Sequence, residues 1–414
     1  MTNLESVYGK KYTKIIADAI DIFKSGVKAA DPYNAIKQSF QITKSILSIK
    51  TITGKQFKYN LESYNQIFLV GAGKAVAPMA VAMEDILGNR LNGGYIIVNY
   101  GYYLPLKKLE YTEAGHPIPN FNGLEGTKRI ISIIEKCDNK TLVLCLFSGG
   151  GSALLVQPLD CISLHEIQEC THVLISCSAT IDEINAVRKH ISQVKGGLLA
   201  KKAYPATVIT LIVSDVIGDK LDTIASGPTV PDRTTFSDVK NILKKYNMGR
   251  DLPKAIQKVI SDGLRGKIKE TPKASESLFK NVRNLIICNN SKSLRESKKK
   301  AEKLGYNTMI LTSSLCGEVK ETARIFSSLA HKIRSLNLPV KVPACIISGG
   351  EPTVKIKGRG IGGRNQELAL YTAIEIKDLK NILFLSSGTD GIDGITDAAG
   401  AYVTGETVRI EQKV

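Results

Sequence analysis

Short apolar runs that end in glycine-rich turns alternate with longer segments of helical periodicity along most of the chain, and this pattern constrains the fold most strongly. Such runs are typical of buried strands in a parallel sheet, each followed by a helix. The pattern therefore predicts an α/β protein. The strands that we expect cover residues 66–70, 95–98, 141–147, 207–213, 285–288, 308–312, 344–348 and 381–386.

One long amphipathic helix is predicted over residues 181–200, where apolar residues recur at alternating spacings of three and four. These apolar positions are Ile184, Val187, Ile191, Val194 and Leu198. The stretch around residues 236–280 has few strand signals and many lysines, prolines and serines. We therefore expect an N-terminal domain over residues 1–235, a helical connection over 236–280 and a C-terminal domain over 281–414.

The composition is that of an ordinary globular protein. With 414 residues, of which 43% are hydrophobic and 23% charged, the chain is long enough for two or three domains. No apolar run approaches the roughly 18 residues that a membrane-spanning helix needs. The N-terminus carries Glu5, Asp18 and Asp21 and lacks the apolar core of a secretory signal. We expect no membrane association and a cytoplasmic location.

The balance of charges is strongly basic, with 56 Lys and Arg against 39 Asp and Glu, a net charge of +17. Such a surplus attracts anions, but the basic residues are scattered and are not interleaved with aromatic residues for base stacking. We therefore expect no nucleic-acid partner. The eight cysteines form no Cys-x-x-Cys pair and the five histidines show no zinc-ligand spacing, so we expect free thiols and no zinc enzyme.

Two glycine turns follow predicted strands, where open α/β sheets bind ligands. The first contains Gly71, Gly73 and Lys74; its amides can approach an anion and its lysine adds a positive charge, although tight-turn packing explains the glycines equally well. The second consists of Ser148, Gly149, Gly150, Gly151 and Ser152. Three consecutive glycines between hydroxyls form a nest of N–H donors suited to phosphate, and a flexible turn is the alternative. The first turn has neither the Walker nor the dinucleotide spacing, and the second is not the Gly-x-Ser-x-Gly turn of hydrolases.

Acidic and basic side chains follow the later strands. Asp215 follows the run 207–213 after one serine, and it can hold Mg²⁺ or accept a proton from a hydroxyl. Glu351 follows the run 344–348 and, downstream, Gly363 and Arg364 combine close backbone approach with a bidentate cation. A later glycine-rich loop carries Asp390 and Asp393, which we interpret as ligands of Mg²⁺ or of substrate hydroxyls. Together these are the components of phosphoryl transfer.

Ten motifs of this chain, in order, resemble those of the class II glycerate kinases with a C-terminal MOFRL-type domain, from about residue 65 onward. They begin at Gly71, Glu113, Phe147, Glu183, Lys195, Ser214, Ser226, Ser348, Gly363 and Gly388. Ten motifs in the same order are far more specific than any single glycine turn. Members of this family usually continue beyond the last of these motifs with a further helix and a closing segment, so we expect that the chain ending at Val414 is a truncated form.

The resemblance implies an ATP- and Mg²⁺-dependent kinase that phosphorylates D-glycerate, most often to 2-phosphoglycerate. It implies two Rossmann-like three-layer α/β domains with an interdomain cleft, in a monomer or homodimer. Lys74, Asp215 and Arg364 would be catalytic, and Asp215, Glu351, Asp390 and Asp393 would hold the metal. The residues that would bind the cofactor are Gly71, Gly73, Ser148, Gly149, Gly150, Gly151, Ser152, Lys195, Glu351, Gly363 and Asn365.

Two other functions stay open. Some relatives of this family are labelled hydroxypyruvate reductases, which would need a nicotinamide site, and the incomplete Gly-x-Gly turn at Gly71 favours that function little. A nucleotide- or anion-binding protein without catalytic activity is the third interpretation, because a truncated second domain would lack phosphate-binding donors.

Overall fold

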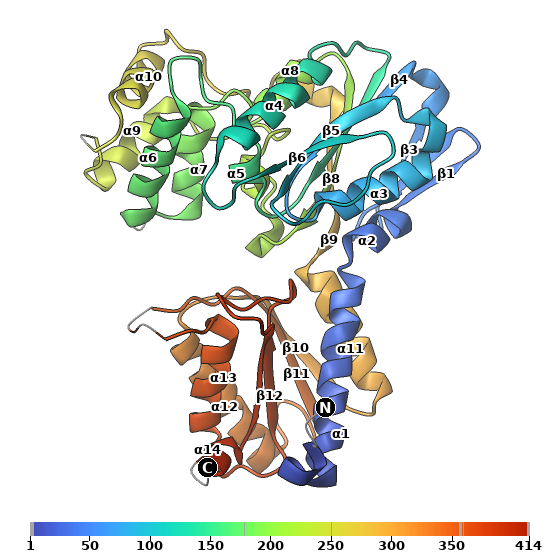
Figure 1. Cartoon of the computed structure of the whole chain (residues 1–414), viewed down its shortest axis with the longest axis vertical. Coiled ribbons are helices and arrows are strands. Elements are labelled where there is room, and N and C mark those ends of the chain that lie inside the picture. The colour runs from blue at the N-terminus through green and yellow to red at the C-terminus, as the bar shows by residue number, and fades with distance from the viewer. Residues whose placement is uncertain (1–3, 178, 250, 356–357, 359, 412–414) are drawn as a thin grey trace. The chain divides into compact units, whose positions relative to one another are not determined.

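The structure is a computed structural model that describes residues 4–177, 179–249, 251–355, 358 and 360–411 (Figure 1). The chain forms two units, a larger one over residues 32–289 and a smaller one that combines residues 1–31 with residues 290–414. Among the described residues, no helix is both long enough and apolar enough to cross a membrane. The cytoplasmic location stays a prediction.

A six-stranded parallel sheet forms the centre of the larger unit. Its strand order is β6-β5-β4-β7-β8-β9, and every neighbouring pair is parallel. The strands are β4 (Gln66–Ala72), β5 (Gly93–Asn99), β6 (Glu110–Ala114), β7 (Thr141–Phe147), β8 (Thr207–Ser214) and β9 (Val282–Asn289). The α/β class predicted from the sequence is confirmed.

The strand order reverses between β4 and β7. The chain winds outward from β4 to β6 on one side and from β7 to β9 on the other, which is the order of a doubly wound nucleotide-binding sheet. The register pairs Ala72 with Phe147, so the two central strands end level with one another. Ligands of such sheets bind beyond the carboxyl ends of the strands at this reversal.

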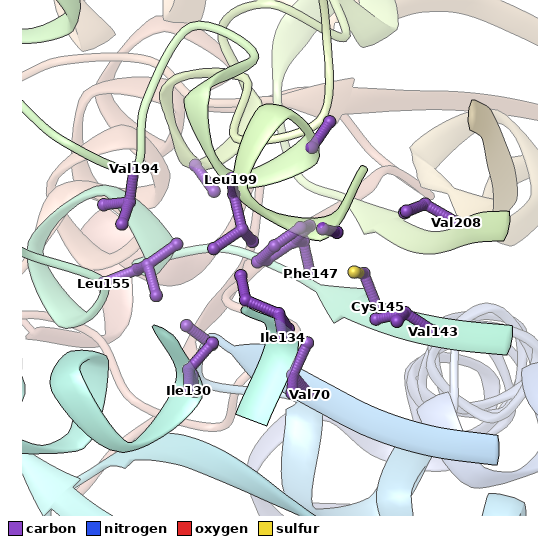
Figure 2. Close-up of a cluster of buried hydrophobic side chains, with 14 of the residues drawn as sticks. Val70, Ile130, Ile134, Val143, Cys145, Phe147, Leu155, Val194, Leu199 and Val208 are labelled. Carbon is purple, nitrogen blue, oxygen red and sulfur yellow. The ribbon is translucent and has the colours of Figure 1, made fainter. Parts of the chain in front are cut away.

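Both faces of the sheet are covered by helices. All seven residues of β7 are buried, as expected of a central strand packed on two sides. Figure 2 shows one face, where Val70, Val143 and Phe147 cluster with Ile134 of α4 (Phe121–Ile134) and Leu199 of α8 (Leu198–Ala203). Helix α3 (Val76–Leu87) also packs against β4, β5 and β7. The ends of the central strands are thereby held on a rigid support.

Four helices form a second cluster within the larger unit, namely α6 (Leu164–Ser176), α7 (Ile181–His190), α9 (Phe236–Lys245) and α10 (Lys254–Leu264). They bury the apolar side chains of Phe236, Val239 and Ile256. The predicted connection over 236–280 is therefore part of the larger unit. Strand β9, which was expected to open the C-terminal domain, also belongs to the larger unit's sheet.

The predicted helix over residues 181–200 is wrong in one respect, because the structure divides it. Helix α7 ends at His190 and α8 begins at Leu198. Between them, Gly196 and Gly197 have φ angles of 56° and 84°, in the left-handed region that interrupts a helix. The periodicity continues across this break because Ile191 and Val194 in the connecting turn are also buried.

A small antiparallel sheet completes the larger unit. It consists of β1 (Phe40–Thr43), β2 (Ile46–Lys50) and β3 (Gln56–Asn60), and it follows helix α2 (Pro32–Ser39). A single helical turn, α5 (Gly151–Leu154), follows β7. The sequence pattern did not predict β1, β2 or β3.

The smaller unit pairs two parallel strands, β10 (Asn307–Leu315) and β11 (Ala344–Gly350), and two antiparallel strands, β12 (Leu383–Ser387) and β13 (Gly400–Thr404). The helices that residues 290–414 contribute to this unit are α11 (Asn290–Lys303), α12 (Val319–Leu336), α13 (Arg364–Glu375) and α14 (Thr407–Glu411).

The first helix of the chain, α1 (Leu4–Ala29), belongs to this smaller unit and not to an N-terminal domain. It is held by hydrogen bonds from Ser293 Oγ to the Gly26 carbonyl (2.8 Å), from Ser297 Oγ to the Ile22 carbonyl (3.0 Å) and from Tyr306 to Asp18 (2.8 Å). These contacts tie residues far apart in the sequence. A domain boundary based on composition along the chain could not include them.

Candidate active site

The triple-glycine turn at the end of β7 needs its glycines for space and for backbone geometry. Gly150 has a φ of 83°, in the left-handed region. A methyl group on Gly151 would lie 2.8 Å from Ala225 Cβ and 3.0 Å from the Ala72 carbonyl oxygen. Since neither position accepts a side chain easily, the turn presents backbone N–H groups of the kind that bind phosphate.

The turn after β4 is joined to this triple-glycine turn. The Lys74 amide donates to the Gly149 carbonyl (2.9 Å), and the Ala75 amide donates to the hydroxyl of the buried Ser148 (3.0 Å). A methyl group on Gly73 would overlap Ser148 Oγ. The structure therefore brings together Gly73, Lys74, Ser148 and Gly149 at the reversal of the strand order, as the position of both turns after central strands predicted.

His116 and Lys74 lie on either side of Gly150. A methyl group on Gly150 would be 3.1 Å from His116 Cδ2 and 3.3 Å from Lys74 Cγ. Burial, and secondly the Lys74 cation, lower the pKa of His116. His116 is thus a neutral imidazole beside the turn at neutral pH. Sequence reasoning did not assign it a role, because the short edge strand β6 that precedes it was not predicted.

Asp215 follows β8 and lies directly against the triple-glycine turn. A methyl group on Gly149 would overlap the Asp215 carboxylate at Oδ2. A carboxylate and a nest of N–H donors thus lie side by side, together with the Lys74 cation. This arrangement can bind a phosphate group, balance its charge and accept a proton from a hydroxyl.

Lys195, predicted to bind the cofactor, lies behind the triple-glycine turn. Its side chain is buried and donates to the carbonyls of Ser152 (2.7 Å) and Leu155 (2.9 Å). Burial, and secondly the nearby Arg188 cation, lower the pKa of Lys195 to about 7. The lysine therefore holds the end of the turn in place, and direct contact with a cofactor stays a prediction.

A chain of hydroxyls connects the turn to neighbouring motifs. Ser152 Oγ lies 2.9 Å from Ser226 Oγ, which donates to Asn185 Oδ1 (2.8 Å). Ser226 and Asn185 are both buried. Two motifs that carried the family resemblance, at Glu183 and at Ser226, are thereby anchored to the serine that ends the triple-glycine turn.

In the smaller unit, Arg364 and Glu351 form an exposed ion pair of 2.7 Å between Nη1 and Oε1. Arg364 begins helix α13, with Gly363 at the N-cap. The pairing of these two predicted site residues is consistent with a shared site. It also shows that the Arg364 charge is balanced locally by Glu351.

Asp393 has a structural function at the start of α13. It is 1% exposed, and its carboxylate accepts hydrogen bonds from the amides of Asn365 (3.0 Å) and Gln366 (2.8 Å) and from both of their side chains. Although burial alone would raise it, these hydrogen bonds hold the pKa of Asp393 below its usual value. Asn365 in turn accepts from Ser386 Oγ (2.7 Å).

The metal ligands predicted in the smaller unit do not form a cluster. Asp390 Oδ1 accepts from the Ile392 amide (3.3 Å) in a local turn, and Asp393 is occupied by N–H donors. Within the described part of the chain, no group of three or more His, Cys, Asp or Glu side chains could hold a metal ion. The roles of Glu351, Asp390 and Asp393 in metal binding stay predictions.

Comparison with known proteins identifies two family models in this chain. Residues 18–261 match "Domain of unknown function (DUF4147)" and residues 344–414 match the MOFRL family. The D-glycerate 2-kinase of Thermotoga maritima is 40% identical over 392 residues, 94% of this chain and 86% of that protein. The glycerate 2-kinase of Pyrococcus horikoshii is 41% identical over 384 residues, 92% of this chain and 84% of that protein.

A putative hydroxypyruvate reductase of Agrobacterium vitis is 39% identical over 342 residues, 82% of this chain and 76% of that protein. Among solved structures, a glycerate kinase from Thermotoga maritima superposes with a TM-score of 0.82 at 38% identity, covering 96% of this chain and 88% of that chain. The resemblance inferred from the ten motifs is confirmed by these matches. The chain belongs to the glycerate 2-kinase family, with the DUF4147 domain followed by the MOFRL domain.

Proposed function

We propose that this chain transfers the terminal phosphoryl group of ATP to the 2-hydroxyl of D-glycerate and releases ADP and 2-phosphoglycerate. The observation that carries this proposal is the contact between the two glycine turns, which places Lys74 and the Asp215 carboxylate beside Gly149 and Gly150. Its similarity to two glycerate 2-kinases over more than nine-tenths of the chain supports the same reaction.

Each of these groups has a role in the proposed transfer. The N–H groups of Gly149 and Gly150 bind phosphate oxygens, whereas the Gly151 N–H donates within the turn to the Ser148 carbonyl (3.3 Å). Lys74 balances the charge that builds up on the phosphate oxygens. Asp215 accepts the proton of the glycerate hydroxyl as its oxygen attacks phosphorus. The bond between the terminal phosphorus and the bridging oxygen breaks, and the electron pair leaves on ADP.

Mg²⁺ would be bound together with the phosphates of ATP. Mg²⁺ is usually bound by one or two carboxylates together with substrate phosphates and water, and does not need a protein cage of three acids. The Asp215 carboxylate fits this requirement because it lies against the turn that would bind the phosphates. When bound, the ion neutralises phosphate charge. In this proposal one Asp215 oxygen is the protein ligand of the ion in the larger unit and the other accepts the proton. The interdomain cleft expected from the sequence stays a prediction.

The glycine turn after β4 supports the reductase alternative less well than the kinase. Dinucleotide-binding sheets of the same strand order carry a third glycine, three residues after Gly73 in this numbering. Val76 occupies that position and is fully buried. The turn therefore lacks the close helix approach that the dinucleotide fingerprint provides.

A coupled assay separates the possible functions. Purified protein of residues 1–414 with ATP, MgCl₂ and D-glycerate should release ADP, and chromatography of the product should give 2-phosphoglycerate. Consumption of NADH or NADPH with hydroxypyruvate, without ADP release from glycerate, would instead identify a reductase. Nucleotide binding without either turnover would favour the binding protein, and 3-phosphoglycerate would correct the regiochemistry. Lys74→Ala is the matched inactive control, provided that circular dichroism shows it folded.

A further inference from the structure

A small cavity of about 30 Å³ lies next to the triple-glycine turn, on the side of helices α6 and α7. Ser152, the last residue of the turn, lines it, together with Gln157, Arg188 and Lys195. A cavity of this volume holds about two water molecules, which is close to the size of one carboxylate group. It is too small for a nucleotide.

Two basic side chains line this cavity and no acidic one does. Arg188 and Lys195 line it, and none of its lining residues is Asp or Glu. Arg188 is half-buried, and burial lowers its pKa. Among the described residues, its guanidinium makes no hydrogen bond or ion pair. The neighbouring Cys170 thiol does not supply a counter-charge, because burial raises its pKa to about 12.

The next residue of the same helix shows that the fold can neutralise a buried cation. Lys189 is buried and pairs with Asp232 at 3.2 Å and with Asp222 at 3.7 Å. Arg188, one position earlier, has no such partner in the described chain. A desolvated charge without a partner is costly, so an anion from outside the chain is the natural counter-charge for Arg188.

The cavity also offers complementary polar groups. An ammonium group has three N–H donors, and Lys195 uses two of them for the carbonyls of Ser152 and Leu155, which leaves one. Gln157 Oε1 is buried without a hydrogen-bond donor among the described residues. The Arg188 cation, the remaining Lys195 N–H donor and one unused acceptor match a carboxylate that carries a hydroxyl close to it.

We propose that this cavity is the carboxylate subsite of the hydroxy-acid substrate, in which Arg188 pairs with the carboxylate and Gln157 Oε1 accepts a hydrogen bond from a hydroxyl of the acid. This inference rests on the proposed function and names the residues that select its substrate. Ser152 links the cavity to the triple-glycine turn, so an acid held there lies beside the phosphate-binding amides.

The test uses D-glycerate itself as the probe. Isothermal titration calorimetry on the full chain measures its Kd for the parent, for Arg188→Gln and for Arg129→Gln, a matched loss of an exposed arginine on α4. We expect Arg188→Gln to raise the Kd and the KM for D-glycerate by roughly 10- to 100-fold, the effect of a charge-assisted hydrogen bond. Its KM for ATP should stay within about twofold of the parent, since the ATP phosphates bind elsewhere. Arg129→Gln should match the parent throughout.

Two further variants keep the test decisive if Arg188→Gln fails to fold. Arg188→Lys keeps the charge and should weaken D-glycerate binding less than Arg188→Gln, while Gln157→Leu should weaken it without changing the charge. The inference is overturned if the folded Arg188 and Gln157 variants bind D-glycerate as tightly as Arg129→Gln, or if the parent binds none. If the parent binds D-glycerate through Arg188 but releases no ADP, the subsite stands and the kinase proposal fails.

Discussion

The Asp215 carboxylate lies so close to Gly149 that any side chain at position 149 would overlap it. The end of β8 and the turn after β7 are therefore fitted to one another, and the carboxylate and the N–H donors of the turn share one small volume. This contact explains why β7 is followed by a glycine and the neighbouring strand β8 by an acid.

Gly149→Ala should displace either Asp215 or the turn and lower kcat for D-glycerate by about 100-fold or more, as expected for a misplacement of about 1 Å at a reacting group. The control is Gly249→Ala, because a methyl group there would meet no atom within 4 Å. Steady-state kinetics with circular dichroism as the folding check measures both. A folded Gly149→Ala with parental kcat would show that Asp215 does not act beside this turn.

Arg364→Lys should keep the positive charge but lose the planar guanidinium that can donate two parallel hydrogen bonds. The substitution should lower turnover by roughly 10- to 1000-fold. Arg324→Lys is the matched control, because Arg324 also forms an exposed ion pair in the smaller unit, with Glu321 at 3.0 Å. Parallel kinetic measurements on the two variants decide whether Arg364 touches substrate. If both behave like the parent, the Arg364 pair with Glu351 is a surface ion pair only.

Lys195 should make the stability of the protein depend on pH. Its pKa is about 7 in the folded chain and about 10.4 in an unfolded one, so between these values the unfolded state binds more protons. Raising the pH from 7 to 9 should therefore stabilise the parent relative to Lys195→Met, by at most about 1.4 kcal/mol per pH unit. Urea unfolding at several pH values measures this difference. Equal slopes for the two proteins would show that Lys195 keeps its proton when folded.

Asp393→Asn should reduce the free energy of unfolding by about 2 kcal/mol. The carboxylate now accepts hydrogen bonds from N–H groups on both of its oxygens, and the amide nitrogen of Asn could not accept them. Thermal melts should show the same loss with and without MgCl₂. Asp390→Asn is the control. Asp390 is exposed and, within the described chain, accepts a hydrogen bond only from its own turn, which Asn also supports. A loss that appears only with MgCl₂ would instead identify Asp393 as a metal ligand.

The sequence predicted best what depends on continuous burial. The run over residues 141–147 coincides with β7, and the glycine turns that follow the central strands meet as their positions implied. Strand β6 was missed because only Ala114 of its residues Glu110–Ala114 is fully buried, so this edge strand forms no continuous apolar run. His116 was missed with it. Arg188 gave no signal either. In the sequence it lies beside an apolar stripe. Only the structure shows that, among the described residues, Arg188 has no acidic partner while Lys189 has two.

Helix α1 has a consequence for the order in which this protein can form during synthesis. All residues of the larger unit emerge from the ribosome after α1 and before the helix α11 against which α1 packs. At about 5–20 residues per second, α1 therefore waits roughly 10 to 50 s for its partner. During that time its buried residues, such as Ile16, have no native surface to cover them. A chaperone that binds short apolar segments would therefore find a target in α1 before the larger unit has been made.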